Sequence, residues 1–256
     1  MWTDPLYALY ERHLVATLDP DRRPSHIGVI LDGHRRFARA EGLSDYRASY
    51  EVGVAKFEQF LAWCRELSIP AVTAWVLSSE NLGRSSAELD HLFQVLGGLL
   101  DRVGPLAGKL DASLRCIGSL DLLPAPLVEA AKSAEAEAAT PGSWHVTIAL
   151  GYGGRQEIVD ACRALVSDLA RRGVSLAEMA EHITAESLGA NLYQADVADP
   201  DLIIRTSGEA RLSGFLLWQS AYAEFAFVDP FWPAFRRVDF LRALRDFGLR
   251  DRRFGR

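Results

Sequence analysis

The sequence predicts an α/β fold, a single domain in which helices surround a central, mostly parallel sheet of six strands. Apolar, β-rich runs alternate with stretches of helical periodicity. The runs are nearly continuous in apolar residues, as is typical of strands that are covered on both faces. No repeat, low-complexity tract or Gly/Ser linker marks a boundary, so we expect a helical segment at residues 1–23 followed by one domain at residues 24–256.

Strands and helices are expected in alternation along the chain. The six predicted strands are His26–Asp32, Ala71–Ser78, Ala112–Ser119, Trp144–Tyr152, Leu202–Gly208 and Ala223–Asp229. The helices between them are predicted at about Ser49–Leu67, Ser86–Leu106, Pro124–Ala139, Arg155–Arg172 and Asp239–Leu249. Ligands of such sheets bind beyond the carboxyl ends of the strands, so polar residues at those ends are the first candidates for a site.

Composition excludes several classes of protein. With 34 acidic and 28 basic residues the net charge is −6, which argues against nucleic acid as a partner. The 49% of hydrophobic residues is ample for a core, yet no run approaches the roughly 18 apolar residues of a membrane span, so no stable membrane insertion is expected. Cys64, Cys116 and Cys162 form no CxxC pair, which favours three core residues in a reduced, cytoplasmic protein.

The first predicted strand ends in Asp32-Gly33-His34-Arg35-Arg36, where strand periodicity changes to helical. Gly33 permits a tight turn, and a helix that begins here directs free backbone N–H groups at an anion. One carboxylate beside two arginines suits a magnesium diphosphate, because Mg²⁺ takes one or two carboxylates and completes its shell with phosphate oxygens and water. The alternative is that Asp32 only caps the helix and that the arginines are solvated.

Two further strand ends carry polar groups. The second strand leads into a turn with hydroxyl, amide and guanidinium groups, Ser78 to Arg84, which could also be an ordinary loop. The fifth leads into Arg205, Arg211 and Ser213, a set suited to bidentate phosphate recognition unless it is a surface loop balanced by Glu209. The glycines of residues 151–155 lack dinucleotide-loop spacing, which leaves a phosphate turn or a close-packing turn.

Five ordered strings together resemble the cis-prenyltransferases, the Z-type isoprenyl diphosphate synthases related to undecaprenyl and Z-farnesyl diphosphate synthases. They are HIGVILDGHRRFA (26–38), AWVLSSENLGR (74–84), GYGGRQEI (151–158), DLIIRTSGEARLSGFLLWQSAYAEF (201–225) and RDRRFG (250–255). The resemblance runs from about residue 24 to the C-terminus. It implies a parallel sheet surrounded by helices, a homodimer, isoprenoid diphosphate substrates and a hydrophobic tunnel for the growing chain.

The resemblance also implies roles for individual residues. Asp32 would hold Mg²⁺ on the allylic diphosphate, joined by Glu224, while Gly33, Arg35 and Arg36 would contact that diphosphate. Arg205, Arg211 and Ser213 would bind the diphosphate of the five-carbon acceptor. Asn81 and Arg84 would belong to the catalytic loop, Ser78 would contact the substrate, and Arg253 and Gly255 would cross the dimer.

Two substitutions depart from the family pattern at the site. His34 stands where the family has Asn; it either preserves a hydrogen bond or, as a group that can exchange a proton near neutral pH, changes the reaction. Tyr50 stands at the His of the family's Gly-His-x-x-Gly and cannot carry positive charge, for which Arg47 could compensate.

The bulky residues Phe57, Phe60, Trp63, Trp75 and Val76 are either tunnel walls or ordinary core residues. As walls they predict a short product of C10 to C15, because a close-packed tunnel limits chain length.

Three functions stay open: regular Z elongation with isopentenyl diphosphate, irregular head-to-middle coupling of allylic diphosphates into lavandulyl-type skeletons, and a noncatalytic partner subunit.

Overall fold

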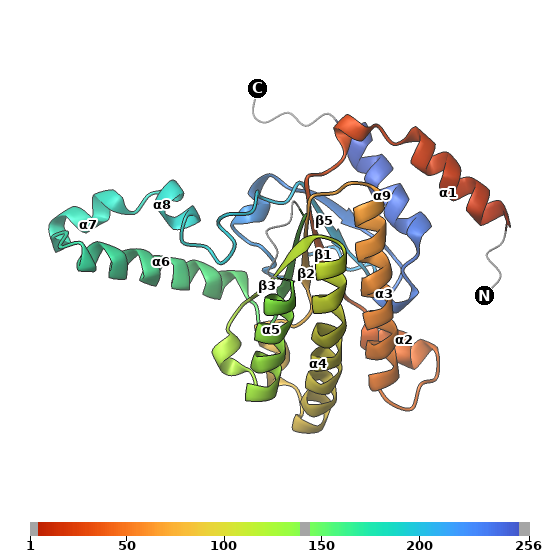
Figure 1. The fold of residues 1–256 in the computed structure, drawn as a ribbon, viewed down its shortest axis with the longest axis horizontal. Coiled ribbons are helices and arrows are strands. Elements are labelled where there is room, and N and C mark those ends of the chain that lie inside the picture. Colours follow the sequence, from red (N-terminus) through yellow and green to blue (C-terminus); the bar gives the residue numbers. More distant parts are fainter. Residues whose placement is uncertain (1–4, 139–143, 251–256) are drawn as a thin grey trace.

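The computed structural model describes residues 5–138 and 144–250, and these contain one six-stranded sheet in which every pairing is parallel (Figure 1). The strands are β1 (His26–Ile30), β2 (Ala71–Trp75), β3 (Ala112–Ile117), β4 (Trp144–Ala149), β5 (Leu202–Arg205) and β6 (Glu224–Phe227). Their order is β3-β4-β2-β1-β5-β6. The predicted fold class is confirmed.

The strands end earlier than the sequence indicates, because their last predicted residues turn into the loops at the carboxyl edge. In register, Ile30 lies beside Trp75 on one side and Arg205 on the other. Residues just after these three therefore come from β1, β2 and β5 but lie close together. The chain leaves β1 towards β2 and returns much later to β5, so β1 marks the crevice where such sheets bind ligands.

Helices cover one face of the sheet. They are α3 (Arg47–Glu66), α4 (Ser86–Lys109), α5 (Ala125–Glu137) and α9 (Arg237–Leu249). Their buried apolar side chains form the larger core with the strands. A smaller core on the other face is closed by an irregular segment that contributes Phe215 and Leu216, and not by a helix. Both faces of the sheet are therefore covered, as the continuous apolar runs of the strands predict.

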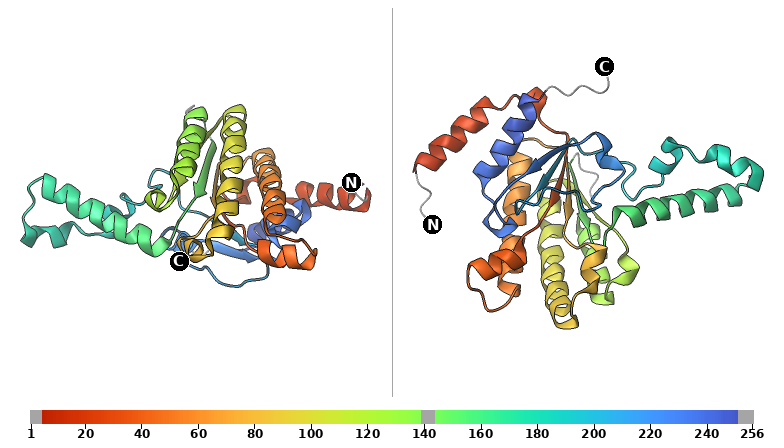
Figure 2. Two further views of the ribbon diagram at one scale, coloured as in Figure 1. Left: turned by 90° about the horizontal axis from the view of Figure 1, so that it is seen from below. Right: turned by 180° about the vertical axis from the view of Figure 1, so that it is seen from behind.

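Two elements extend from the body of the molecule on opposite sides (Figures 1 and 2). On one side α6 (Gly154–Arg171), α7 (Leu176–His182) and α8 (Ala185–Gly189) form a projecting arm. On the other, α1 (Pro5–Thr17) lies along α9 and buries Leu14. None of the helices in the described residues is long and apolar enough to cross a membrane.

A short helix not delimited by the sequence patterns, α2 (His34–Ala40), follows β1 directly. Helix α4 begins at Ser86, as the sequence predicts, and Ser85 is its N-cap. Cys64 and Cys116 are free and buried, and Cys162 is free and partly buried, in line with their expected core role.

Candidate active site

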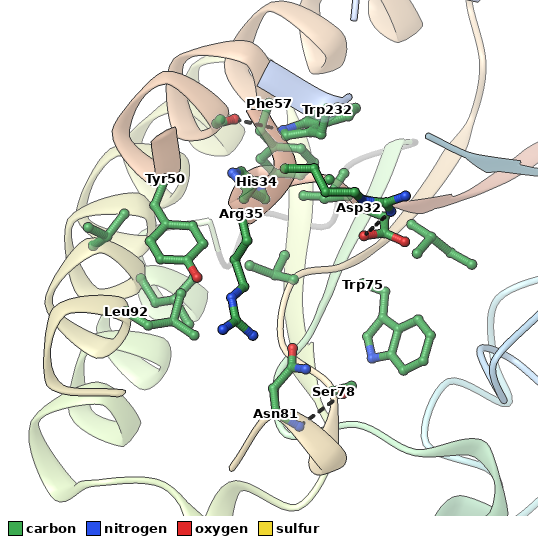
Figure 3. A pocket seen from close by; sticks show the side chains of 18 of the residues that line it. Asp32, His34, Arg35, Tyr50, Phe57, Trp75, Ser78, Asn81, Leu92 and Trp232 are labelled. Atoms are coloured by element: carbon green, nitrogen blue, oxygen red, sulfur yellow. Dashed lines mark hydrogen bonds and ion pairs between the residues drawn. The ribbon is translucent and has the colours of Figure 1, made fainter. Parts of the chain in front are cut away.

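A cavity of about 670 Å³ opens at the carboxyl ends of β1, β2 and β5 and extends between α3 and α4 (Figure 3). Its size is in the range of small-molecule sites. One part is lined by charged and polar groups that include Asp32, His34, Arg36, Asn81 and Arg205. The other part is apolar and is lined by Val54, Phe57, Leu92, Val95, Leu96, Leu99 and Trp232. The cavity therefore suits a ligand with a charged head and an apolar tail.

The turn after β1 requires glycine. Gly33 has a φ of 103°, a left-handed conformation, and precedes α2 as its N-cap. A Cβ atom at residue 33 would lie 2.7 Å from the ring of Phe231 and 3.0 Å from Ser207. This close packing fixes Asp32 and His34 on the two sides of the turn, both facing the cavity.

Asp32 is held between two arginines. Arg205 Nη2 donates to Asp32 Oδ2 at 2.8 Å, and Arg36 Nη2 lies 3.5 Å from Oδ1. Burial raises the pKa of the Asp32 carboxyl, but the hydrogen bond and charge of Arg205, with the charge of Arg36, outweigh it, so the pKa is lowered overall. Asp32 is therefore a carboxylate at neutral pH.

The loop after β5 is organised around Arg205, whose side chain is only 6% exposed. Its Nη1 donates to Ser213 Oγ at 2.7 Å and to the Arg211 carbonyl oxygen, and its buried Nε has no hydrogen-bond partner. Ser207 and Ser213 both adopt left-handed φ angles, a strained conformation for side-chain-bearing residues. Of the two, Ser213 lines the cavity, so strained backbone lies at the cavity wall, as is typical of functional loops.

Glu209 offsets part of the positive charge, as the surface-loop alternative anticipated. It accepts from Arg36 at 2.8 Å and also pairs with Arg211. However, both arginines line the cavity, so their ion pairs do not remove them from the site. An entering anion would compete with Glu209 for these guanidinium groups.

His34 is a neutral imidazole at physiological pH. Burial lowers its pKa from 6.5 to about 4. Its Nδ1 lies 3.2 Å from the Ser49 carbonyl oxygen, which can only accept, so Nδ1 carries the proton and Nε2 is left as an acceptor. The ring packs against Tyr50, with centroids 5.1 Å apart.

Near the end of β2, the turn η2 (Ser79–Gly83) brings Asn81 and Arg84 to the cavity. Ser78 Oγ accepts from the Asn81 backbone N–H at 3.2 Å and so caps the turn. Arg84 Nη1 donates to the Tyr50 hydroxyl at 2.9 Å and to Glu88 Oε1 at 3.1 Å. The loop is thus fixed by contacts from α3 and α4.

Most of the predicted site residues line this one cavity: Asp32, Gly33, His34, Arg35, Arg36, Tyr50, Ser78, Asn81, Arg84, Arg205, Arg211 and Ser213. Arg47 does not line it; its guanidinium pairs with the exposed Glu51 one turn along α3. Arg253 and Gly255 lie outside the described residues.

Glu224 is the clearest correction. It is the first residue of β6 and pairs in register with Leu202, at the amino edge of the sheet, whereas Asp32 lies beyond the carboxyl edge. Its carboxylate forms an ion pair with Arg250. Within one chain the two carboxylates cannot share a metal ion, and the described residues contain no cluster of three or more His, Cys, Asp or Glu side chains that could hold one.

The apolar wall was only partly foreseen. Phe57, Trp75 and Val76 line the cavity, but Phe60 is fully buried against Trp232 and Phe240, and Trp63 packs against Phe235 and Phe240. The leucines of α4 were missed, although Leu92, Leu96 and Leu99 recur at the spacing of one helix face. Arg39, four residues after Arg35 on α2, and Glu80 were also missed.

The glycines of residues 151–155 form a close-packing turn. The Gly154 N–H donates to the Gly214 carbonyl oxygen at 3.0 Å, and a Cβ atom at residue 154 would lie 2.3 Å from that oxygen. The turn thus packs directly against the segment that carries Ser213. The phosphate-turn alternative has no support, since Gly151, Gly153 and Gly154 do not line the cavity.

Comparisons with known proteins agree with this geometry. Residues 30–255 match the profile of a family described as putative undecaprenyl diphosphate synthase. The chain is 46% identical to the short-chain Z-isoprenyl diphosphate synthase of Mycobacterium leprae over 257 residues, covering 99% of this chain and 97% of that one. It is also 46% identical to the (2Z,6E)-farnesyl diphosphate synthase of Thermobifida fusca over 251 residues, with coverages of 98% and 97%.

A solved structure has the same fold. The lavandulyl diphosphate synthase of Lavandula x intermedia, in complex with dimethylallyl diphosphate, superimposes with a TM-score of 0.86 at 31% identity, covering 92% of this chain and 100% of that one. The chain belongs to the cis-prenyltransferases, the family of Z-type isoprenyl diphosphate synthases.

Proposed function

We propose that the protein is a Mg²⁺-dependent prenyl diphosphate synthase that condenses an allylic diphosphate, dimethylallyl or geranyl, with isopentenyl diphosphate. The product is a Z-configured isoprenoid diphosphate of C10 to C15, and pyrophosphate is released. The observation that carries the proposal is the amphipathic cavity, in which Asp32, Arg36 and Arg205 meet at one part and the side chains of Phe57, Leu96 and Leu99 line the other.

The site suits Mg²⁺ only as the ion of a metal–diphosphate complex. Asp32 offers one ionised carboxylate, part of it exposed to the cavity, and Mg²⁺ commonly binds one protein carboxylate and takes its remaining ligands from phosphate and water. Asp32 would hold the ion. When bound, Mg²⁺ supplies positive charge that stabilises the departing pyrophosphate.

The cavity's own side chains supply the rest of the chemistry. Arg35 and Arg36 bind the allylic diphosphate and stabilise the negative charge that develops as its C–O bond breaks. Arg205, Arg211 and Ser213 bind the acceptor diphosphate, and thereby direct the acceptor double bond at the allylic carbon. The apolar wall excludes water, which would otherwise trap the allylic cation.

A short product is supported by the dimensions of the cavity and by the relatives. Phe57 and Trp232 are large, well-packed side chains on its apolar wall. Close-packed side chains move little, so they limit the length of the isoprenoid chain that the cavity can hold. The similar proteins of M. leprae and T. fusca bear the names of short-chain Z-isoprenyl and Z-farnesyl diphosphate synthases.

The test is an incubation of the purified protein with dimethylallyl or geranyl diphosphate and Mg²⁺, with and without isopentenyl diphosphate. The proposal expects product only when isopentenyl diphosphate is present, with C10 to C15 mass and a Z double bond by NMR. No turnover of either allylic diphosphate would contradict it and favour a noncatalytic partner subunit.

Irregular head-to-middle coupling is the second candidate, and His34 favours it. A neutral imidazole with a free Nε2 can accept a proton in a way that an Asn amide cannot, so a different proton could be removed after the carbon–carbon bond forms. Product from dimethylallyl diphosphate alone, with a branched skeleton, would establish this reaction. If it occurs, His34→Asn is expected to shift the product towards regular elongation.

We further propose that the protein is a homodimer. The projecting arm and the outer edge of the sheet expose apolar side chains, among them Val159 and Val166 on α6 and Phe227 on β6. Unpaired edge strands and apolar patches are typical interfaces. Light scattering on the eluting protein is expected to give twice the mass of one chain, 28.3 kDa. A single-chain mass would contradict a dimer.

A further inference from the structure

Glu88 lies outside the cavity but contacts side chains that line it. Its carboxylate is 13% exposed and does not line the cavity, but it bonds to three residues that do. Glu88 Oε1 accepts from the Tyr50 hydroxyl at 3.2 Å and from Arg84 Nη1 at 3.1 Å, and lies 3.6 Å from Arg35 Nε. These contacts join α4 to α3, α2 and the turn after β2.

This arrangement is not what helix capping requires. Ser85 is the N-cap of α4, so Glu88 occupies the third position of the helix, where a glutamate usually reaches back to the N-cap N–H. Helix α4 has no side-chain hydrogen bond at its cap. The carboxylate is instead directed at Arg84 and Tyr50, away from the role that its position favours.

Tyr50 completes a closed set of contacts. Its hydroxyl accepts from Arg84 Nη1 at 2.9 Å and donates to Glu88, so each of the three side chains bonds to the other two. Burial raises the pKa of Tyr50, which keeps the phenol protonated as a donor. The histidine usual at this position of the family motif could not donate to Glu88 and accept from Arg84 through one atom.

The positive charge of the cavity favours these contacts among Tyr50, Arg84 and Glu88. Arg84 shares the cavity with Arg35, Arg36, Arg39, Arg205 and Arg211, and the Glu88 carboxylate offsets part of the repulsion that these charges exert on Arg84. Both contacts to Tyr50 and Glu88 use Nη1. They leave Nη2 and Nε of Arg84 for an anion in the cavity, the edge that binds phosphate oxygens in a bidentate manner.

We propose that Glu88 and the hydroxyl of Tyr50 are positioning residues that hold Arg84 towards a diphosphate bound in the cavity. The inference rests on the proposed function in that it takes a diphosphate as the ligand. The substitution of Tyr for His at residue 50 then exchanges a direct substrate contact for a contact that fixes Arg84.

The first test measures the affinity of inorganic pyrophosphate, in the presence of Mg²⁺, by calorimetry. Glu88→Gln keeps the shape of the side chain but removes its charge, and is expected to weaken binding about tenfold, the value of one charge-assisted hydrogen bond. Tyr50→Phe is expected to weaken it severalfold. Asp90→Asn is the matched control, because Asp90 is an exposed carboxylate in the same turn of α4, and its affinity is expected to be unchanged.

A second comparison separates positioning from general stability. In an Arg84→Lys background, Glu88→Gln is expected to cause no further loss of pyrophosphate affinity, because lysine cannot use the same fork. A tenfold additional loss would show that Glu88 acts independently of Arg84 and would overturn the proposal. Unchanged or tighter binding by Glu88→Gln alone would also overturn it, since Glu88 would then only compete with the anion.

Turnover distinguishes this proposal from the proposed function. With prenyl substrates, Glu88→Gln is expected to lower kcat/KM about tenfold while Asp90→Asn matches the unmodified protein. If the unmodified protein has no prenyl transferase activity but its pyrophosphate affinity depends on Glu88, Tyr50 and Arg84 as described, the proposed function is wrong and the positioning role stands. If it is active and the variants bind and turn over normally, the positioning role is wrong and the function stands.

Discussion

The ring of His34 occupies the space in which a side chain at residue 53 would lie. A Cβ atom at Gly53 would be 2.2 Å from His34 Cε1, far inside contact distance. The two residues belong to α2 and α3, so this fit sets how closely the two helices pack beside the cavity. Glycine at residue 53 is therefore matched to histidine at residue 34.

Gly53→Ala is expected to destabilise the protein by about 1–3 kcal/mol, since overpacking outweighs the gain in helix propensity. Gly98→Ala is the control, because nothing lies within 4 Å of a Cβ atom at residue 98 inside α4, and it is expected to stabilise by up to about 1 kcal/mol. Urea denaturation measures both. The smaller side chain of His34→Asn is expected to recover part of the loss in the double variant; no recovery would contradict the steric account.

Asp32→Asn is expected to reduce kcat at least a hundredfold, because the neutral amide cannot neutralise a metal ion or balance Arg205. Steady-state kinetics, together with circular dichroism to verify the fold, measures the effect. A variant within tenfold of normal kcat would rule out a metal role for Asp32.

Substitutions of Arg36 and Arg47 test which arginines belong to the diphosphate site. Arg36 lines the cavity and Arg47 pairs with the exposed Glu51 outside it. Arg36→Gln is expected to raise the KM for the allylic diphosphate at least tenfold, whereas Arg47→Gln is expected to change KM less than twofold. Equal effects would mean that the diphosphate binds nearer to the start of α3 than the cavity indicates.

Substitutions of Phe57 and Phe60 distinguish a residue of the tunnel wall from a residue of the core. Phe57→Ala enlarges the cavity and is expected to lengthen the product by one five-carbon unit or more, as mass spectrometry of the products would reveal. Phe60→Ala removes the same ring from the core below and is expected to cost about 3–5 kcal/mol of stability without changing product length. A longer product from Phe60→Ala but not from Phe57→Ala would mean that Phe60, and not Phe57, limits the length of the chain.

Because His26 is buried, we expect acid to lower the stability of the fold. The ring is buried, with Nδ1 2.6 Å from the Ala198 carbonyl oxygen and Nε2 2.8 Å from Thr73 Oγ1, and burial lowers its pKa from 6.5 to about 4. Between these values the unfolded chain binds a proton that the folded chain does not. His26 therefore lowers the free energy of unfolding, by up to about 1.4 kcal/mol per pH unit, as pH falls from about 6.5 to 4.

Urea denaturation at a series of pH values measures this dependence. His26→Gln is expected to flatten the slope in that range, at some cost in stability, while the exposed His13→Gln is expected to leave it unchanged. An unaltered slope in His26→Gln would assign the acid sensitivity to other groups.

The sequence was sufficient for the strands and for most polar site residues, because both depend on local patterns. Continuous apolar runs mark buried strands, and charged residues directly after them mark the carboxyl edge. Asp32, Arg36 and Arg205 were found in this way. The predicted strands were too long since a residue such as Leu31 or Ser207 is apolar or small enough to continue a strand but turns into a loop here.

What depends on the path of the chain in space was not predictable. Glu224 stands in a motif beside site residues, yet the motif crosses from the carboxyl edge to the amino edge of the sheet before reaching it. Phe57 and Phe60 are three residues apart on one helix, and only packing decides which faces the cavity. Glu88 was overlooked because a glutamate in the first turn of a helix has an ordinary explanation.

The most direct measurement is a crystal structure of the protein with Mg²⁺ and an unreactive thio analogue of an allylic diphosphate. The account predicts the diphosphate beside Asp32, Arg35 and Arg36, with the isoprenoid chain running along Phe57 and the leucines of α4. A diphosphate bound elsewhere on the protein, with this cavity left to solvent, would contradict it.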